Sequence, residues 1–546
     1  MKRKAVAAVL TAVMVASMFT GCGSDNGSSS AKSAKSTSAA SAANDTVDED
    51  GKVNGIMYQE GLPLVDEGDY TFSIFCDDSS ESGEFIMLDE FKKQTNVDVD
   101  LKIYPYETAT ERLNLDLNSG DYADVIGGWT LSDNAILTYG VNQGVFIPLE
   151  DYFEKYCPNI SAILDLPGVR EKMTAPDGHI YTIPYVCADS TVGYSPYINT
   201  KWLENVGMSM PTTTDEFEAV LKAFKEQDAN GNGDASDEIP FSTDPNNKHI
   251  EAMAGYFGLP MNKLGIAIQD EKVVYGGVSN TYREFLSWFH KLYADGLVDV
   301  ELYTQDSSTW EGKGNQDLYG VSIAYGSGEF TGIPAAEERG DFDSMPVLNT
   351  DKGGIWLRDT EGFSVYRTQA VITNKAEHPE IICRWFDNAF ALENGIGCNR
   401  GPVGVIVNKE DDGYHAIDTT TLSEEDQEKY SWSNLWPQSL PKYLPADFEF
   451  VEEHPMYDEK KATEEAYEAN LTKEIIPSYW IDLDKIDTFS DTNTAIKDFF
   501  EQQQAQFVCG ELDIDNDADW QAYVDGMYSL GLEDWVATQG IEEIAK

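Results

Sequence analysis

Basic side chains are scarce in this sequence, and their scarcity excludes several classes of function. The 546 residues contain 38 Lys and Arg against 96 Asp and Glu, which gives a formal net charge of −58. A protein with this charge repels phosphate groups instead of releasing their counterions, so nucleic acid is excluded as a partner. The same charge disfavours a polyanionic ligand, although a local basic pocket could still bind one.

Cysteine, histidine and the short signatures of catalysis are also sparse. The seven Cys include no CxxC pair, and the six that follow Cys22 predict buried thiols, with a bridge between one pair as the alternative. Six His form no HExxH motif, and no GxSxG, P-loop or GxGxxG signature is present. We therefore predict a protein that is not an enzyme. The alternative is a surface-tethered glycoside hydrolase that uses two carboxylates.

Long apolar runs are absent after the N-terminal segment. The chain begins with Lys2-Arg3-Lys4, continues with an apolar stretch over residues 5–19, and reaches Gly21-Cys22 before a polar segment. The stretch is shorter than the roughly 20 residues that span a bilayer, so residues 1–21 are predicted to be a signal peptide. Cys22 after small residues resembles the bacterial lipobox, in which the thiol is lipidated; ordinary cleavage with a spare thiol is the alternative.

The segment after Cys22 is poor in aromatic and apolar residues. Residues 23–50 are mostly Ser, Ala, Gly, Asn and Asp, a composition that cannot bury a core. We predict a lipid-anchored tether over residues 22–65. The protein is then expected on the extracellular face of the bacterial cell membrane, which it touches only through the lipid.

The rest of the chain has the periodicity of an α/β fold in two or three packed units. Residues 70–75 alternate as a strand, residues 85–91 repeat as a helix face, and residues 97–103 alternate again. Asp124-Val125-Ile126 predicts a short buried strand that ends at Gly127-Gly128-Trp129. Parallel strands of a doubly wound sheet bind ligands at their carboxyl ends, which points to Asp77, Asp78 and Trp129.

A second unit is predicted to begin near Gly193. Thr213 and Glu216 form a capping box before a helix whose apolar residues recur at i, i+3, i+4 and i+7. A strand over residues 319–324 leads into a Gly-rich turn at Tyr325, and the C-terminal part of the chain is mainly helical.

Five segments stand in a characteristic order: Ser119–Ile126, Phe146–Glu150, Asp177–Pro184, Asn199–Leu203 and Pro211–Phe217. The helical pattern over residues 374–390 and the C-terminal Gln506-Phe507, Gly510 and Trp520 extend it. In this order the chain resembles the family 1 extracellular solute-binding lipoproteins of ABC importers, and in particular the long subgroup that includes alginate-binding proteins. The resemblance covers nearly all of the chain after the tether.

The resemblance implies a periplasmic-binding-protein-like fold with two α/β lobes, hinge strands, a ligand cleft and extra C-terminal helices. Mapped onto this chain, lobe one comprises residues 66–188 and 358–400, and lobe two comprises residues 189–357 and 401–546. The hinges fall near residues 186–193 and 356–364. The expected function is to capture a carbohydrate, expected to be an oligosaccharide, as a monomer and to deliver it to the permease subunits of an ABC transporter. A peptide or another polar solute is the alternative ligand.

An acidic loop has the spacing of a calcium site. Oxygen-bearing side chains at positions 1, 3 and 5 and Gly233 at position 6 suit a cation that takes six to eight oxygen ligands around a sharp turn. The predicted ligands are Asp228, Asn230, Asn232, the backbone carbonyl of Asp234, Asp237 and Glu238, and the predicted role is structural. The loop departs from an EF-hand because position 12 is Ile239, and a plain Asn/Gly turn that caps a helix is the alternative. The later acidic run, residues 513–519, lacks Gly at position 6 and is predicted to be a solvated helix start.

Aromatic residues near strand ends are the candidates for sugar binding, because sugars combine apolar C–H faces with hydroxyl edges. The candidate rings are Trp129, Tyr185, Tyr325, Trp356, Trp432 and Trp436, with Asp77, Asp78, Glu329 and Arg358 as polar partners. Core packing is the alternative for each ring. The net charge favours a neutral sugar over a uronate, although Arg358, Arg384 and Arg400 could line a basic pocket.

Overall fold

The computed structural model describes residues 45–78, 84–245, 249–332, 340–445, 448–451, 455–541 and 543–545. The predicted signal peptide, Cys22 and the first part of the predicted tether lie outside these residues. All six cysteines in the described ranges are free thiols, five of them buried. The prediction of buried thiols is therefore confirmed for five of the six, and Cys509 is exposed.

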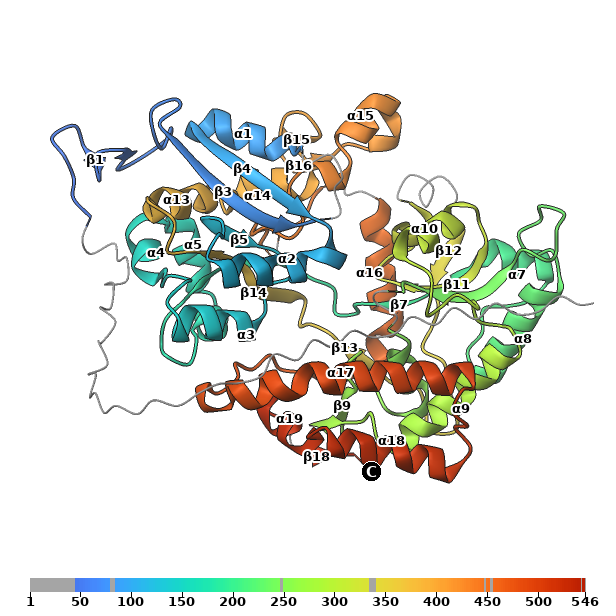
Figure 1. The fold of residues 1–546 in the computed structure, drawn as a ribbon. Coiled ribbons are helices and arrows are strands. Elements are labelled where there is room, and N and C mark those ends of the chain that lie inside the picture. The colour runs from blue at the N-terminus through green and yellow to red at the C-terminus, as the bar shows by residue number, and fades with distance from the viewer. Residues whose placement is uncertain are drawn as a thin grey trace, which may run out of the picture. The chain divides into compact units, whose positions relative to one another are not determined.

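The first sheet has five strands in the order β4 (Val97–Tyr104), β3 (Tyr70–Asp77), β5 (Val125–Gly127), β14 (Phe363–Ile372), β6 (Thr182–Ala188) (Figure 1). β3 is parallel to β4 and β5, while β14 is antiparallel to β5 and β6. Phe72 and Ile74 pack with Phe91 of α1 (Ile86–Thr95) and Trp385 of α13 (Pro379–Ala389). Phe75 belongs to a separate cluster with α2 (Tyr106–Ser119), so both faces of the sheet are covered.

The second sheet has four strands in the order β12 (Phe342–Ser344), β7 (Ser195–Asn199), β11 (Tyr319–Ala324), β8 (Ile239–Thr243). Its core includes helix α8 (Thr214–Glu226), where Thr213 is the N-cap and accepts a hydrogen bond from Glu216 N, as predicted. α8 buries Phe217, Val220, Leu221 and Phe224 at the predicted helical spacing. α9 (Asn280–Ala294) packs into the same hydrophobic cluster.

The chain passes between the two sheets at the predicted hinge segments. Residues 189–194 join β6 of the first sheet to β7 of the second, and residues 359–362 join β13 (Trp356–Arg358) to β14. β13 pairs in parallel with β17 (Leu471–Ile475), which follows helix α16 (Pro455–Tyr467). These connections are short, so residues at the ends of β6, β7 and β14 from the two sheets lie close together. The site described below is built from these residues.

Helices close the C-terminal part of the chain: α17 (Ile486–Cys509), α18 (Asp517–Ser529) and α19 (Leu532–Thr538) (Figure 1). α17 reaches both cores, because Ile486 packs in the cluster of α2 whereas Phe500 and Phe507 pack with α9. Asn516 is the N-cap of α18 and accepts a hydrogen bond from Ala518 N. The acidic run over residues 513–519 is therefore a helix start, as predicted.

Shorter elements complete the two lobes. In the first lie α3 (Asp133–Ala135), η2 (Ile136–Asn142), α4 (Glu150–Tyr156), α5 (Pro158–Leu164), α6 (Val169–Met173) and α14 (Leu392–Arg400). In the second lie α7 (Thr200–Val206), η3 (Ile250–Phe257), β9 (Ile266–Gln269), β10 (Lys272–Tyr275), α10 (Ser307–Asn315) and α11 (Gly328–Thr331).

The contacts revise two of the predicted boundaries. Strands β1 (Lys52–Val53) and β2 (Met57–Tyr58) lie within the predicted tether, yet Val53, Met57 and Leu64 are buried in the core of the first sheet. These contacts favour a tether that ends before residue 53. Trp436 and Leu440 also pack in this core, although the predicted boundary assigns residues 401–546 to lobe two. These contacts favour placing residues 436–440 with lobe one.

Candidate ligand-binding site

Three aromatic rings cluster at one end of the first sheet. Trp129 follows β5, Tyr185 lies on β6 and Tyr366 lies on β14. The Tyr185 and Tyr366 rings stack with centroids 5.5 Å apart and an interplanar angle of 20°. The Trp129 ring stands nearly perpendicular to that of Tyr366 at 5.4 Å, and its side chain is 43% exposed. The site thus offers an open indole face beside a stacked pair.

A second group of rings comes from the other lobe. Tyr194 precedes β7, His249 precedes η3 and Tyr325 follows β11. The Tyr194 and His249 rings stack at 4.0 Å with an angle of 11°, and Tyr325 lies edge-on to Tyr194 at 6.2 Å. Tyr325 is 37% exposed, so this group also presents an open ring.

Asp189 joins the two groups of rings. It follows β6, and its carboxylate accepts hydrogen bonds from the Tyr366 hydroxyl at 2.6 Å and from the Tyr325 hydroxyl at 3.2 Å. Rings from the two sheets therefore meet at one carboxylate. We refer to Trp129, Tyr185, Tyr194, His249, Tyr325, Tyr366 and Trp432 as the ring cluster.

Carboxylates and one ammonium group surround the ring cluster. Glu329 accepts a hydrogen bond from Tyr325 N at 2.9 Å, and Asp359 accepts one from Gly193 N at 2.6 Å. Both side chains are open to solvent, yet desolvation by the surrounding protein raises the pKa of Glu329 to about 7 and that of Asp359 to about 6. A side chain that solvent reaches but that protein atoms surround on most sides lies in a concave part of the surface, as Glu329 and Asp359 do.

Lys460 of α16 lies across this concave surface. Its Nζ donates to the carbonyl of Gly193 at 2.5 Å and to that of Tyr325 at 2.7 Å, and it lies 3.9 Å from the centroid of the Tyr325 ring. Desolvation lowers the pKa of Lys460 to about 8, against the charges of Glu329, Asp359, Glu464 and Asp189, which act in the opposite direction. The ammonium group is thus held by backbone carbonyls at the hinge.

Two predicted ligand carboxylates instead position loops. Asp77 is fully buried and accepts hydrogen bonds from Trp129 N at 2.9 Å and Thr130 N at 2.6 Å. Gly128, with a φ of +134°, makes room for it, since a Cβ there would lie 2.3 Å from the Asp77 carboxylate. Asp78 is 2% exposed and accepts a hydrogen bond from Gln438 N at 2.7 Å. We therefore assign both to holding the loops that carry Trp129 and Trp432.

Lys442 lies behind two of the rings. Its Nζ is 5.2 Å from the centroid of Tyr185 and 5.7 Å from that of Trp432, and it donates to Gln438 Oε1 at 2.8 Å. The side chain is 1% exposed, and desolvation lowers its pKa to about 8. Trp432 is 45% exposed, and its position beside the same Lys442 ammonium group as Tyr185 adds it to the ring cluster.

Three further predicted contacts lie elsewhere. Trp356 is 1% exposed in the second core, and Trp436 is fully buried and stacks on Trp385 at 5.7 Å. A ring buried on both faces cannot stack on a ligand, so these two predictions are corrected to core packing. Arg358 donates to the carbonyl of Thr472 and pairs with Glu468 at 3.2 Å, and it lines the cavity described below.

Sequence reasoning missed Asp189, Tyr194, His249, Tyr366, Lys442 and Lys460. Asp189 follows a strand of the first sheet directly, so the strand-end rule applied to Asp77 could have found it. Tyr366 comes from a strand that is separated from the end of β6 by 174 residues, and no local pattern links it to Trp129.

A cavity of about 980 Å³ lies beside the ring cluster. Thr130, next to Trp129, and Asp359, at the hinge, both line it. Its other walls include parts of α2, α3 and α17 and combine amide and hydroxyl side chains, such as Asn114, Asn493 and Thr494, with apolar side chains and the basic Arg358 and Lys497. This volume is at the upper end of the usual range for ligand pockets, so the site has room for more than one sugar ring.

The acidic loop at Asp228 has the hydrogen bonding of a cation-binding turn. Asp228 Oδ2 accepts a hydrogen bond from Gly233 N at 3.0 Å, and Asp237 accepts from the side-chain amides of Asn230 and Asn232. Asp228 Oδ1 and Glu238 Oε2 are buried without a hydrogen-bond partner among the described residues. Buried carboxylate oxygens that lack a donor are costly, so these residues fit a calcium ion that would bind them.

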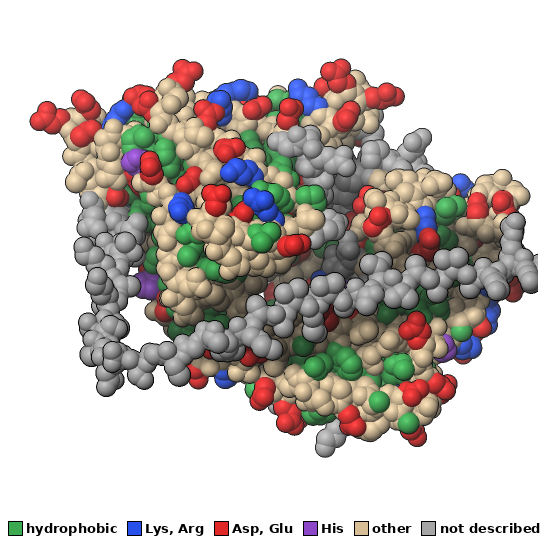
Figure 2. Space-filling model, in the orientation of Figure 1, with side chains coloured by type: hydrophobic (Ala, Val, Ile, Leu, Met, Phe, Trp, Pro, Cys, Tyr) green, Lys and Arg blue, Asp and Glu red, His purple; other side chains and the backbone are tan. Residues whose placement is uncertain are grey.

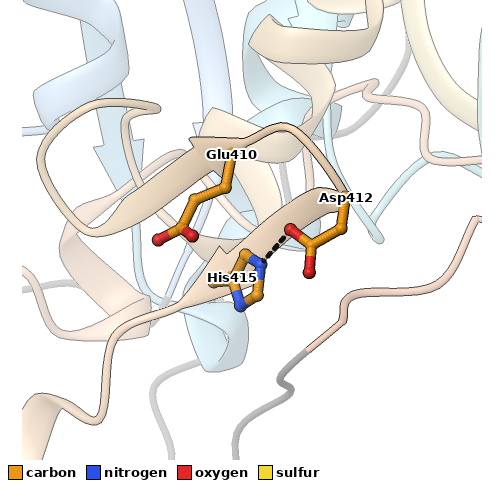
Figure 3. Close-up of side chains that lie close together, drawn as sticks. All are labelled: Glu410, Asp412 and His415. Atoms are coloured by element: carbon orange, nitrogen blue, oxygen red, sulfur yellow. Dashed lines mark hydrogen bonds and ion pairs between the residues drawn. The ribbon is translucent and has the colours of Figure 1, made fainter.

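The described residues also bring together Glu410, Asp412 and His415, on the hairpin of β15 (Val407–Glu410) and β16 (Gly413–Ala416) (Figure 3). His415 Nε2 lies 2.9 Å from Asp412 Oδ1, and both carboxylates are exposed. The sequence analysis did not identify this group.

Acidic side chains are distributed over the visible face of the molecule (Figure 2), in keeping with the formal charge of −58. None of the helices in the described part of the chain has both the length and the apolar character needed to span a bilayer.

Two lobes, hinge connections and a ring-lined site between them define the class of two-lobed solute-binding proteins. Residues 79–395 match the family model described as bacterial extracellular solute-binding protein, and the chain belongs to this family. The predicted family, the predicted fold class and the prediction that the chain is not an enzyme are thereby confirmed. Proteins of this family bind solutes as components of transport systems.

Three similar proteins illustrate the relationship. The fructooligosaccharide ABC transporter substrate-binding protein FusA of Streptococcus pneumoniae serotype 4 is 31% identical over 411 residues, which cover 73% of this chain and 70% of FusA. A solved structure of the S. pneumoniae FusA EF-hand mutant in complex with fructo-nystose is 26% identical, with a TM-score of 0.72, over 86% of this chain and 98% of that one. The alginate-binding protein AlgQ2 without calcium ion is 21% identical, with a TM-score of 0.71, over 88% of this chain and 99% of that one; it shows the fold alone.

Proposed function

We propose that this protein is the substrate-binding component of an ABC importer and that it binds an oligosaccharide between its two lobes. The observation that carries the proposal is the ring cluster, in which open faces of Trp129 and Tyr325 come from different lobes and meet at Asp189. Aromatic faces stack on the C–H surfaces of sugars, while carboxylates accept hydrogen bonds from sugar hydroxyls. The adjoining cavity supports a ligand of several rings.

The transporter assignment is supported by the name of FusA, a fructooligosaccharide ABC transporter protein, with which this chain shares most of its length. We propose that lobe closure around the sugar creates the surface that the permease subunits contact. We also propose that Cys22 carries a lipid that holds the protein at the extracellular face of the membrane. The relative Lipoprotein LipO of Bacillus subtilis supports this second proposal, with 28% identity over half of this chain.

We propose further that the loop at Asp228 binds a structural calcium ion. Asp228, Asn230, Asn232, the carbonyl of Asp234, Asp237 and Glu238 would hold it. The unpartnered buried oxygens of Asp228 and Glu238 support this assignment, as does the description of a relative as an EF-hand mutant. A closed shell of protein ligands leaves no position for substrate, so the ion would stabilise the fold.

A thermal-shift screen tests the main proposal. The tether-free protein, residues 45–546, is melted with neutral and acidic oligosaccharides of graded length and with a peptide panel. A ligand at 100 times its dissociation constant adds about 2.7 kcal/mol of stability, which moves the midpoint measurably. We expect a shift with one class of oligosaccharide that is lost in Trp129→Ala and retained in Trp480→Ala. Shifts with peptides alone would overturn the carbohydrate assignment.

A further inference from the structure

The charges around the ring cluster are predominantly negative. Four carboxylates, those of Asp189, Glu329, Asp359 and Glu464, act electrostatically on the single ammonium group of Lys460. Asp244 adds a further negative charge close to Tyr194 and Glu329. A sugar on the Lys460 side of the ring cluster therefore meets more acidic groups than basic ones.

The ammonium groups of the two lysines beside the rings already donate hydrogen bonds to acceptors within the protein. Lys460 donates to two backbone carbonyls, those of Gly193 and Tyr325. Lys442 donates to Gln438 and is covered by the protein, since only 1% of the residue is exposed. Neither ammonium group presents an open position to the carboxylate of a sugar acid.

The three arginines that could have formed a basic pocket are engaged by other groups of the protein, although Arg358 lines the cavity and Arg400 acts electrostatically on Lys442 and Cys187. Arg358 binds Glu468 and the carbonyl of Thr472, and Arg384 donates to the carbonyls of Tyr58 and Gly61. Arg400 donates to the carbonyl of Asn399, and its guanidinium lies 5.7 Å from the ring centroid of Phe450. Each guanidinium thus already has protein partners, which compete with planar, forked binding of a uronate carboxylate.

Asp189 is the carboxylate at the centre of this arrangement. It has one hydroxyl donor from each lobe, Tyr325 and Tyr366, at the point where the two groups of rings meet. Its Oδ1 also accepts a hydrogen bond from Ser190 N at 2.8 Å, so three of the about four acceptor positions of an ionised carboxylate are filled and Oδ2 can accept one more hydrogen bond. A sugar hydroxyl can fill this position, whereas a second carboxylate would be repelled.

We infer that the site selects neutral oligosaccharides over uronic-acid oligosaccharides of the same length, with Asp189 as the residue that sets this preference. The inference rests on the proposed carbohydrate function and specifies its substrate class. It separates this chain from binders of acidic polysaccharides that share its fold, such as the alginate-binding protein AlgQ2.

The test is isothermal titration of the wild-type protein with matched trisaccharides. Kestose, maltotriose and xylotriose are the neutral probes, and trigalacturonate and trimannuronate are the acidic ones. We expect at least one neutral probe to bind at least tenfold more tightly than either acid. Any residual binding of the acids should strengthen as added salt screens the repulsion, while binding of the neutral probe should not change.

Variants assign the preference to Asp189. Asp189→Asn should reduce the ratio of neutral to acidic affinity at least fivefold, whereas Glu154→Gln, which removes one exposed carboxylate from α4, should leave the ratio unchanged. If Asp189→Asn melts well below the wild type, the same affinity ratio is measured in Glu329→Gln, which removes a negative charge at the rim of the same site. An unchanged ratio in a folded Asp189→Asn protein would overturn the assignment to this residue.

The outcomes separate the inference from the function on which it rests. Tighter binding of trigalacturonate or trimannuronate than of every neutral probe would overturn the inference and leave the carbohydrate function standing. Binding of no probe by a protein with a sound melting curve would overturn both.

Discussion

Gly128 illustrates how a missing side chain positions a functional one. Its left-handed backbone and the absence of a Cβ allow the Asp77 carboxylate to reach Trp129 N and Thr130 N. Two charge-assisted hydrogen bonds then fix the loop that carries the exposed indole. The geometry of this ring is therefore set by backbone contacts.

We predict that Gly128→Ala weakens sugar binding at least tenfold, because the new methyl group displaces Asp77 and releases the Trp129 loop. Titration calorimetry with the sugar identified in the thermal screen measures the effect. Gly144→Ala is the matched control, since Gly144 also has a positive φ but a methyl group there would meet no neighbour within 4 Å. Equal affinities in the two variants would contradict the role given to Gly128.

His249 should make folding stability depend on pH. Burial, with a smaller contribution from Lys263, lowers the pKa of His249 to about 3, whereas an unfolded chain has a His pKa near 6.5. Between these values the unfolded chain binds more protons, so this contribution is complete above about pH 6.5 and is lost as the pH falls. The slope from one such group is at most about 1.4 kcal/mol per pH unit.

We expect His249→Asn to flatten the pH profile of unfolding between about pH 6.5 and 3, measured by denaturant titration at each pH. Asn suits the left-handed φ of +48° at this position. His179→Asn should act with the opposite sign, because Glu150 raises the pKa of His179 and the stability it contributes is lost as the pH rises. A His249→Asn profile that parallels the wild type would contradict the prediction.

The sequence predicts individual helices and strands far better than contacts between residues that are distant in the chain. Strand alternation located β3, β4 and β5, and helical spacing located the buried face of α8. Trp129 could be predicted as a site residue because it directly follows a strand, and the end of a strand is visible in the local sequence. Tyr366 and Lys460 reach the same site from segments far along the chain, and Trp436 is buried by a helix pair that no local pattern describes.

The loop between α8 and β8 is the element for which a ligand should matter most to stability. We predict that a chelator lowers the melting temperature of the calcium-loaded protein, by the loss of about 2.7 kcal/mol if calcium had been present at 100 times its dissociation constant. Sugar binding should persist, because the loop is separate from the ring cluster. Calorimetry and titration measure the two quantities.

Paired variants make the calcium prediction specific. Asp228→Asn should abolish the response to the chelator, whereas Asp515→Asn, in the acidic helix start before α18, should retain it. A melting temperature that does not move on chelation of the wild-type protein would refute calcium binding at this loop.

At the scale of the whole molecule, hydroxyl groups from both lobes converge on the hinge segment at Asp189. We predict that Tyr325→Phe, which keeps the ring and removes one of these hydroxyls, increases the radius of gyration of the ligand-free protein in small-angle X-ray scattering. Tyr528→Phe, on the exposed side of α18, is the control and should leave it unchanged. A radius that is the same in both variants would show that this hydrogen bond does not restrain the lobes.

β1 and β2 pack against the first sheet, and this packing attaches the N-terminal segment to lobe one. Asp45 accepts hydrogen bonds from Tyr156 and Asn54, so the first described residues of the chain are fastened to lobe one. With the proposed lipid at Cys22, lobe one would be the lobe next to the membrane anchor. Closure on the proposed ligand would then move lobe two relative to the lobe that the anchor holds.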